Sequence, residues 1–401
     1  MDFELTDAQL KWRDEVRAFI RHNVTPELLH ERDKSPEGML RYGPEGLGFR
    51  KKVGRTGWHG LAWPKEYGGM GRGVIEQYIL VRELDYAKIS PHTVYDMTVT
   101  VVAPTIMRYG TEQNKQEFLP AIARGEIRTA LGYSEPDAGT DLASLRTRAE
   151  LDGDEWVING SKIWNSSAHG STHQWLLVRT DPQARRHEGI SIVMVPMTAR
   201  GIEVRPLIAW SDYQTNQLFF TDVRVPRGHL IGEVNKGWQY IVGALDLERG
   251  GLAETGDLKR ELDELIEACR AVRIGDASLI DQPHVGRRLA ELDADVEVAQ
   301  LYGLYGASLL EGGEVPSTTL TASKVYSSEL RTKIADFGMQ IFGIHGQLSW
   351  RDPDAPGRGA MERLYRSAPM NRFGGGTNEV MRDIIAQRGY GMPTYGRSKR
   401  N

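Results

Sequence analysis

The sequence predicts a mostly α-helical protein with a β domain in its middle. Near the start, apolar residues recur at helical intervals, at Trp12, Val16 and Phe19. From about Thr129 the pattern changes to short apolar segments between polar turns, which is typical of strands. From Asn235 it becomes helical again, and an apolar stripe with steps of three and four residues predicts a helix bundle. The stripe consists of Val285, Leu289, Leu292, Val296 and Ala299.

The N-terminal segment opens with a helix-start signal. Thr6 precedes Gln9 by three positions, which is the spacing of a capping box. Proline and glycine then interrupt the helical pattern at Pro26, at residues 43–48 and at residues 64–73. We therefore expect several shorter helices up to about Arg128.

The middle segment is expected to begin with a hairpin. Residues 156–158 and 161–164 flank Asn159-Gly160, a dipeptide typical of a two-residue hairpin turn. Further strands are predicted at His173–Thr180, Ile190–Met197, Ile202–Trp210 and Gln217–Val225. In the C-terminal segment, further helices are predicted at Ser317–Phe342 and Asn378–Arg388.

Composition narrows the class of protein. The 401 residues carry a formal net charge of −4, which disfavours a strongly basic nucleic-acid-binding protein. The single cysteine, Cys269, excludes an internal disulfide and a cysteine zinc site, and it suits a reducing cytoplasm. The chain starts without an apolar signal segment and has no run of about 18 apolar residues, so we expect a cytoplasmic protein without a membrane span.

The common catalytic motifs are missing from the sequence. It contains no G-x-x-x-x-G-K-[ST] phosphate loop and no G-x-G-x-x-G between a strand and a helix. It also contains no H-E-x-x-H and no G-x-S-x-G, and its ten histidines are scattered. We therefore predict no metal site and none of these nucleotide or hydrolase chemistries.

Four dense segments of polar, aromatic and glycine residues remain. They lie at residues 131–141, 162–167, 245–251 and 372–379. A glycine-rich turn can present backbone N–H groups to a heteroaromatic or anionic ligand, and a Trp can pack on a planar ring. Each segment alone also has a plain structural interpretation: a capped turn, a core Trp164 with a surface serine, or an ion-paired Glu248 on a helix surface.

Together, and in this order and spacing, the four segments resemble the acyl-CoA dehydrogenase family over nearly the whole chain. Residues 64–69, 109–111, 134–141 and 160–164 are also similar to the family's motifs. The resemblance implies an N-terminal α-helical domain at 1–128, a middle β-barrel-like domain at 129–232 and a C-terminal four-helix bundle at 233–401. It further implies FAD as cofactor and an acyl-CoA thioester as substrate.

The resemblance assigns the flavin to residues of the middle domain. Tyr133 and Ser134 would contact the pyrimidine side of the flavin, and Ser134 would also lie near the substrate. Trp164 would lie beside the isoalloxazine ring. Ser166, where the family usually has threonine, would hydrogen-bond the edge of the ring.

The rest of the cofactor is assigned to the C-terminal segment. Thr377 and Glu379 match positions that hold the ribose and adenine side of FAD. Three residues match a segment that binds the pyrophosphate of FAD in a neighbouring subunit: Gln340, Gly343 and Gly346. Ile344 stands where the family has its second glycine in this segment, which is a departure from the pattern.

The family's chemistry requires removal of a proton α to the thioester carbonyl, followed by transfer of a β-hydride to flavin N5. Most members place the glutamate base where this chain has Gly375. A minority, which includes isovaleryl-CoA and long-chain acyl-CoA dehydrogenases, place it on the first long C-terminal helix, and residues 245–249 match their pattern. The resemblance therefore implies Glu248 as catalytic base and Arg249 near the thioester. The N–H of Gly375 could still polarise the thioester oxygen.

One departure concerns assembly. The family usually carries Arg-x-x-Phe-Gly after the first C-terminal helix, reaching a neighbouring subunit's FAD, and residues 270–288 lack it. The chain is thus expected to form a homotetramer or a heterotetramer with a related subunit that supplies the contact. Electron-transferring flavoprotein is the expected acceptor of the electrons.

Glycines at 250, 251, 374 and 375 favour a bulky, branched or cyclic acyl group. Two alternatives stay open: a flavin oxidase or monooxygenase, and a non-catalytic subunit.

Overall fold

The computed structural model describes residues 3–35, 42–89, 91–242, 255–314 and 316–393, which belong to two compact units. The helical unit comprises Met1–Arg17, Val74–Lys88 and Arg249–Asn401, and the mixed unit comprises Ala18–Gly73 and Ile89–Glu248. The predicted N-terminal segment thus contributes to both units. The boundaries predicted at residues 128 and 232 stay a prediction.

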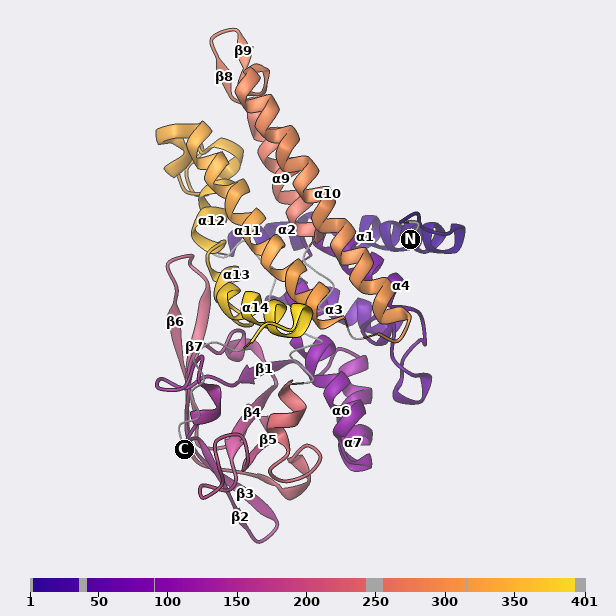
Figure 1. Ribbon diagram of the computed structural model, residues 1–401, viewed down its shortest axis with the longest axis vertical. Helices are drawn as coiled ribbons and strands as arrows, with labels where there is room; N and C mark the ends of the chain where they lie inside the picture. The colour runs from indigo at the N-terminus through magenta and orange to yellow at the C-terminus, as the bar shows by residue number, and fades with distance from the viewer. Residues whose placement is uncertain (1–2, 36–41, 90, 243–254, 315, 394–401) are drawn as a thin grey trace. The chain divides into compact units, whose positions relative to one another are not determined.

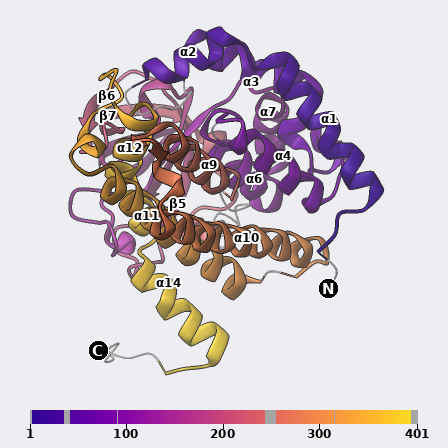
Figure 2. The ribbon, with the colours of Figure 1, turned by 90° about the horizontal axis from the view of Figure 1, so that it is seen from above.

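The helical unit is built around three long helices that pack on one another: α9 (Thr255–Ala271), α10 (Pro283–Glu311) and α11 (Ser317–Phe342). Figure 2 shows α10 and α11 side by side. The predicted apolar stripe is confirmed, because all five of its residues are buried on α10. A hairpin of β8 (Arg273–Ile274) and β9 (Ala277–Ser278) connects α9 to α10 (Figure 1).

Shorter elements complete this unit. The helix α4 (Val74–Tyr86) packs on α9 and α10, and α12 (Ala360–Ser367) packs on α11. The chain then forms α13 (Met370–Phe373), α14 (Asn378–Ile384) and the π-helix η10 (Ile385–Gly389). The predicted helix at 317–342 is confirmed. The one predicted at 378–388 is α-helical only as far as Ile384.

Side chains from the start of the chain attach α1 (Asp7–Asn23) to α4. The predicted capping box is confirmed: Thr6 N donates to Gln9 Oε1 at 2.9 Å and Gln9 N donates to Thr6 Oγ1 at 3.3 Å. The buried Trp12 donates its Nε1–H to the carbonyl of Glu76 at 2.9 Å. Arg17 forms an ion pair with Glu83 at 2.8 Å, so α1 is joined to α4 at two places.

The mixed unit contains one seven-stranded sheet. Its strands follow the order β1-β4-β2-β3-β7-β6, and β5 pairs with β4. The strands are β1 (Thr129–Gly132), β2 (Arg148–Asp152), β3 (Glu155–Lys162), β4 (His173–Arg179), β5 (Ile190–Pro196), β6 (Ile202–Ile208) and β7 (Gln214–Pro226). The contacts of β1 and β2 with β4 are parallel, and the other pairs are antiparallel.

Helices of the same unit precede the sheet along the chain. They are α2 (Pro26–Lys34), α3 (Pro44–Thr56), α5 (Pro91–Val94), the π-helix η3 (Thr98–Val102), α6 (Ala103–Tyr109) and α7 (Glu112–Ala123). The predicted fold class, mostly α with a central β domain, is confirmed by this order of helices, sheet and helices.

The predicted turn at Asn159-Gly160 is wrong. Both residues lie inside β3, which pairs with β2 on one side and with β7 on the other. The chain reverses at Gly153 instead, between the paired residues Asp152 and Glu155. The side chain of Asn159 serves β7: it donates to Asp222 Oδ1 at 3.0 Å and accepts from Asp222 N at 2.9 Å. A register shift between Ile158 and Gly160 accommodates this contact.

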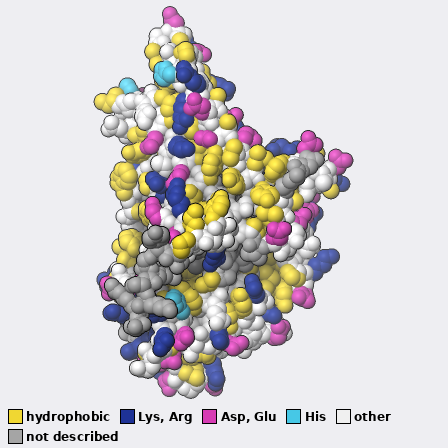
Figure 3. Space-filling model, viewed as in Figure 1, with side chains coloured by type: hydrophobic (Ala, Val, Ile, Leu, Met, Phe, Trp, Pro, Cys, Tyr) yellow, Lys and Arg dark blue, Asp and Glu magenta, His cyan; other side chains and the backbone are white. Residues whose placement is uncertain are grey.

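On the face drawn in Figure 3, positive and negative side chains are interspersed with apolar ones. No helix in the described part of the chain is long and apolar enough to cross a membrane. Within the same residues, no group of three or more His, Cys, Asp or Glu side chains is arranged to hold a metal ion.

Arg50 is a buried charged residue that connects helices of the mixed unit. It lies on α3, is 1% exposed, and donates to Asp96 Oδ2 at 3.0 Å and to the carbonyl of Thr93 at 2.9 Å. Asp96 also accepts from Thr98 N at 3.0 Å at the start of η3. Because a buried charge is costly without its partner, this pair constrains how α3 meets residues 93–98.

We expect Arg50→Ala to lower the free energy of unfolding by about 3–5 kcal/mol, because Asp96 loses its partner in a largely buried position. Urea unfolding followed by circular dichroism measures the change. Arg124→Ala is the matched control, since Arg124 and Glu126 form an exposed pair. Equal destabilisation by the two substitutions would contradict the assignment.

Candidate functional site

The predicted flavin residues of the mixed unit come from two neighbouring segments. Tyr133 and Ser134 directly follow β1, and Trp164 and Ser166 lie just after β3. A hydrogen bond from Ile163 N to the Ser134 carbonyl, at 2.9 Å, joins the two segments. The structure therefore brings these four predicted residues together.

The turn after β3 displays Trp164 outward. Trp164 has a φ of 61° and is 62% exposed, and Ser166 is also exposed. A large exposed indole on a left-handed backbone is unusual for a residue with a side chain. The turn thus offers a flat apolar ring and a hydroxyl, which suits contact with a planar heteroaromatic ligand.

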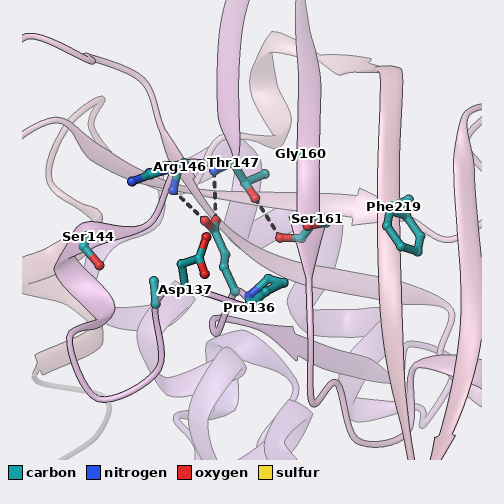
Figure 4. A pocket seen from close by; sticks show the side chains of 10 residues that line it. Pro136, Asp137, Ser144, Arg146, Thr147, Gly160, Ser161 and Phe219 are labelled. Carbon is teal, nitrogen blue, oxygen red and sulfur yellow. Dashed lines mark hydrogen bonds between the residues drawn. The ribbon is translucent and has the colours of Figure 1, made fainter.

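A buried ion pair lies beneath these segments. Lys162, fully buried at the end of β3, donates to Glu135 Oε1 at 2.9 Å and to the Tyr133 carbonyl at 3.0 Å. The Glu135 carboxylate also accepts from Arg146 N at 2.7 Å and Thr147 N at 2.8 Å (Figure 4). One carboxylate thereby fixes the loop after β1, the chain before β2 and the end of β3.

The charges of the two members stabilise each other against the cost of burial. Burial lowers the pKa of Lys162 to about 8, while the negative charge of Glu135 opposes the effect. Burial by itself raises the pKa of Glu135, but the charge and hydrogen bond of Lys162 outweigh it, and this pKa lies below its ordinary value.

A pocket of about 390 Å³ opens over the same ion pair. Figure 4 shows Asp137, Arg146, Thr147 and Ser161 among the residues that line it. Six of its ten lining residues are polar or charged, and one, Phe219, carries an aromatic ring. The arrangement can accept a polar group of modest size, but none of the predicted site residues lines it.

The helical unit holds a second group of predicted residues. Thr377 caps α14, accepting from Val380 N at 3.2 Å. The buried Asn378 beside it accepts from Lys324 Nζ at 2.8 Å, and the same ammonium group donates to the Gly376 carbonyl at 2.9 Å. Hydrogen bonds at the helix start lower the pKa of the exposed Glu379.

Gly375 precedes this cap in a left-handed conformation. Its φ is 67°, and that of Gly376 is 105°, values that favour glycine. Lys324 holds this backbone through Gly376. Gly375, the position at which the resemblance places the usual glutamate base, is thus part of a defined backbone shape.

The three residues predicted to meet a pyrophosphate follow one another at the end of α11. Gln340 lies in its last turn and is exposed, Gly343 ends it with a φ of 54°, and Gly346 is buried in the next turn. Ile344, the departure from the family pattern, is 78% exposed.

The segment without Arg-x-x-Phe-Gly forms the β8–β9 hairpin and the start of α10. The guanidinium group of Arg273 donates to the Asp276 carbonyl and to Ser278 Oγ, the latter at 3.1 Å. Asp281 accepts from Ser278 N at 2.8 Å. Arg273, which lies in the segment without the motif, therefore makes its hydrogen bonds within its own hairpin.

The predicted base and its neighbours, Glu248, Arg249, Gly250 and Gly251, lie outside the described residues. The other predicted residues fall into two groups, one in each unit. The roles assigned to all of the predicted residues stay predictions.

Sequence reasoning gave no role to several polar residues that shape these segments. They are Glu135, Lys162, Asn165, Gln174, Asn216, Lys324 and Asn378. Lys162 could have been found from strand alternation, because it shares a face with Trp156 and Ile158, which are buried. The others carry no local signal, since their partners are distant in sequence.

Comparison with known proteins covers almost the whole chain. Models for the N-terminal, middle and C-terminal domains of acyl-CoA dehydrogenases match residues 6–126, 130–223 and 235–390. Acyl-CoA dehydrogenase FadE26 of Mycobacterium tuberculosis is 38% identical, with 99% of this chain and 100% of the relative covered.

Two solved structures give the same result. One is named the Tcur3481-Tcur3483 steroid ACAD, with a TM-score of 0.89, 38% identity and coverage of 98% of this chain and 100% of that one. The other is the ChsE4-ChsE5 complex from Mycobacterium tuberculosis, with a TM-score of 0.88 and the same identity and coverage.

We expect Glu135→Gln to be less stable than the wild-type protein at pH 7 by about 3–5 kcal/mol, since it leaves Lys162 buried without a counter-charge. The unfolded chain takes up the Glu135 proton at a higher pH than the folded chain, so the contribution of this carboxylate is lost as the pH falls below about 4.5. The difference in unfolding free energy should therefore shrink in acid.

Urea unfolding at pH 7 and at several lower pH values measures this difference. Glu150→Gln, at an exposed position on β2, is the control. A difference that stays constant from pH 7 into the acid range would contradict the role of the ion pair.

Proposed function

Because the chain belongs to the acyl-CoA dehydrogenase family, whose members are oxidoreductases acting on CH–CH groups, we propose that it dehydrogenates a steroid acyl-CoA between the α and β carbons. The observation that carries the steroid assignment is the full-length similarity, at 38% identity, to a structure named as a steroid ACAD. The glycines at 250, 251, 374 and 375 agree with it, since they leave room for a bulky acyl group.

Members of this family are flavoproteins, and the residues present suit FAD. When bound, FAD supplies the hydride acceptor for the reaction. Trp164 would pack beside the flavin ring, Ser166 would bond its edge, and Tyr133 and Ser134 would meet its pyrimidine side. The exposed indole of Trp164 supports this fit, because it presents a flat apolar face that lacks cover among the described residues.

Further FAD contacts are proposed from the C-terminal segment of the chain. Thr377 and Glu379 are proposed at the ribose and adenine side, and Gln340, Gly343 and Gly346 at the pyrophosphate of a neighbouring subunit's FAD. At Gly343, no described atom lies within 4 Å of the place where a side chain would begin. Open space at a backbone of this shape supports close approach of a phosphate group.

The proposed base is Glu248. Its carboxylate would take the proton from the carbon α to the thioester, and a water-poor pocket would raise its basicity. Gly375 has no side chain that could act as a base, and its N–H is proposed to donate to the thioester oxygen, on which negative charge develops. Arg249 is proposed beside the thioester and the base.

We expect Glu248→Gln to retain FAD and to lose α-proton exchange with solvent by a factor of about 10²–10⁴, because the amide cannot accept the proton. Exchange of deuterium into the acyl-CoA, followed by mass spectrometry, measures the loss. Asp246→Asn, which changes a carboxylate two residues away, is the matched control. Exchange at the wild-type rate in Glu248→Gln would contradict the assignment.

We further propose that a second, related chain completes the cofactor site and that electron-transferring flavoprotein receives the electrons. Two observations support the second chain. The β8–β9 hairpin lacks the family's arginine motif, and Arg273 is engaged within the hairpin. The two similar structures are each named for two gene products, and one is called a complex.

Expressed alone, the chain is expected to bind FAD poorly, and co-expression with a related partner chain should restore a yellow heterotetramer. Flavin absorbance per chain and light scattering measure both properties. Steroid acyl-CoAs should then bleach the flavin faster than straight-chain acyl-CoAs of equal concentration. A stable homotetramer with one FAD per chain would refute the partner proposal and leave the substrate proposal standing.

A further inference from the structure

We infer that Asn165 is a positioning residue that holds the turn carrying Trp164 and Ser166 in the shape that the flavin meets. This inference rests on the proposed function, because it assigns a purpose to the turn that displays both residues. Asn165 itself is fully buried, whereas the residues on either side of it are exposed. It would therefore act through its neighbours and not by contact with substrate.

Every polar group of Asn165 is hydrogen-bonded. Its backbone N–H donates to the Asn216 carbonyl at 2.9 Å, and its own carbonyl accepts from Asn216 Nδ2 at 2.8 Å. Its side-chain Nδ2 donates to the Ile163 carbonyl at 3.1 Å, and its Oδ1 accepts from Gln174 Nε2. Four bonds to three residues fix both the backbone and the side chain at this position.

The turn that Asn165 fixes is one that the chain would not adopt freely. Trp164 has a φ of 61° and Ser167 a φ of 70°, both in the left-handed region. Ser166 N donates to the Trp164 carbonyl at 3.0 Å, which closes the turn tightly. Such a backbone persists only where the surrounding structure over-determines it, and the contacts of Asn165 supply that constraint.

The partners of Asn165 are themselves buried and rigid. Gln174 lies on β4 and Asn216 on β7, and both are fully buried. Gly132 makes room for Gln174, since a Cβ at Gly132 would lie 2.6 Å from Gln174 Nε2. The turn is therefore anchored to two strands of the sheet through amide groups.

The same strand also holds the other half of the proposed flavin contact. Trp175, next to Gln174 on β4, donates its Nε1–H to the hydroxyl of Tyr133 at 3.2 Å. Two consecutive residues of β4 thus reach both segments that the flavin would meet. Their relative position is set by one strand, which is a more rigid arrangement than two independent loops.

A residue that only filled space at this buried position could be apolar. An aliphatic side chain avoids the cost of burying an amide, and it would leave no network to satisfy. The three fully buried amides of Asn165, Gln174 and Asn216 instead fix the orientation of the turn, because hydrogen bonds are directional and apolar contacts are not. Gln174 Oε1 has no hydrogen-bond partner among the described residues, so the network even tolerates one unsatisfied atom there.

The test compares Asn165→Leu and the double variant Asn165→Leu/Gln174→Leu with Asn159→Ala as control. Asn159 is also an asparagine with two side-chain hydrogen bonds in the same sheet, but its partner is Asp222. The double variant removes both polar partners, so it avoids an unpaired Gln174 amide and keeps the experiment informative if the single variant fails to fold.

The first readout is anaerobic reduction of the flavin by acyl-CoA in a stopped-flow instrument, on the holoenzyme with its partner chain. The rate constant is expected to fall about ten- to a hundredfold in both Asn165 variants, with the KM for acyl-CoA nearly unchanged, because misplacement by about 1 Å costs a factor of this order. The flavin absorption bands should also shift.

The second readout needs no cofactor. With the nine tryptophans labelled as 5-fluorotryptophan, the ¹⁹F resonance of Trp164 is identified by Trp164→Phe. One sharp Trp164 resonance is expected in the wild-type apoprotein, and a shifted or broadened one in both Asn165 variants. Asn159→Ala should leave the resonance and the reduction rate as in the wild-type protein.

An unchanged Trp164 resonance together with an unchanged reduction rate in the double variant would overturn the inference. So would an equal loss in Asn159→Ala, because the effect would then belong to the sheet as a whole. If no acyl-CoA reduces the wild-type flavin, the proposed function fails, whereas the ¹⁹F spectrum of the apoprotein still decides whether Asn165 positions Trp164.

Discussion

The ion pair between Lys162 and Glu135 is the contact on which the mixed unit's candidate site depends. Through it, the end of β3, the loop after β1 and the chain entering β2 share one buried charge pair. The segments that carry Tyr133 and Trp164 leave directly from these points. Removing one partner of a buried ion pair costs far more stability than replacing both partners by apolar residues. The pair therefore links the geometry of the site to the stability of the unit.

In the helical unit, a lysine also holds the backbone of the candidate segment in place. There a single ammonium group, that of Lys324, bonds both the last glycine of the run at 374–376 and the first residue of the following helix. Both units therefore use a lysine beneath the backbone to define a segment whose own sequence would permit many shapes. In each case the lysine is separated in sequence from at least part of what it holds.

Local patterns were sufficient for the long helices and for β4 to β7, and insufficient for β1, β2 and the connections. The stripe on α10, the bounds of α11 and the capping box at Thr6 all follow from spacing along a helix, a short-range property. The Asn159-Gly160 turn failed because dipeptide preference was outweighed by pairing of β3 with β7, which involves residues some sixty positions away. The amide network around Asn165 was hidden for the same reason, as its partners lie on two other strands.

The left-handed backbone at Gly375 has a consequence for how such enzymes can diverge. At the position where the family resemblance places the usual glutamate, this chain has a glycine with a φ of 67°, a conformation that costs a side-chain-bearing residue about 1–3 kcal/mol. A single substitution that placed a carboxylate at this position would meet that penalty. A glutamate at position 375 would therefore require a change of the backbone as well as of the side chain.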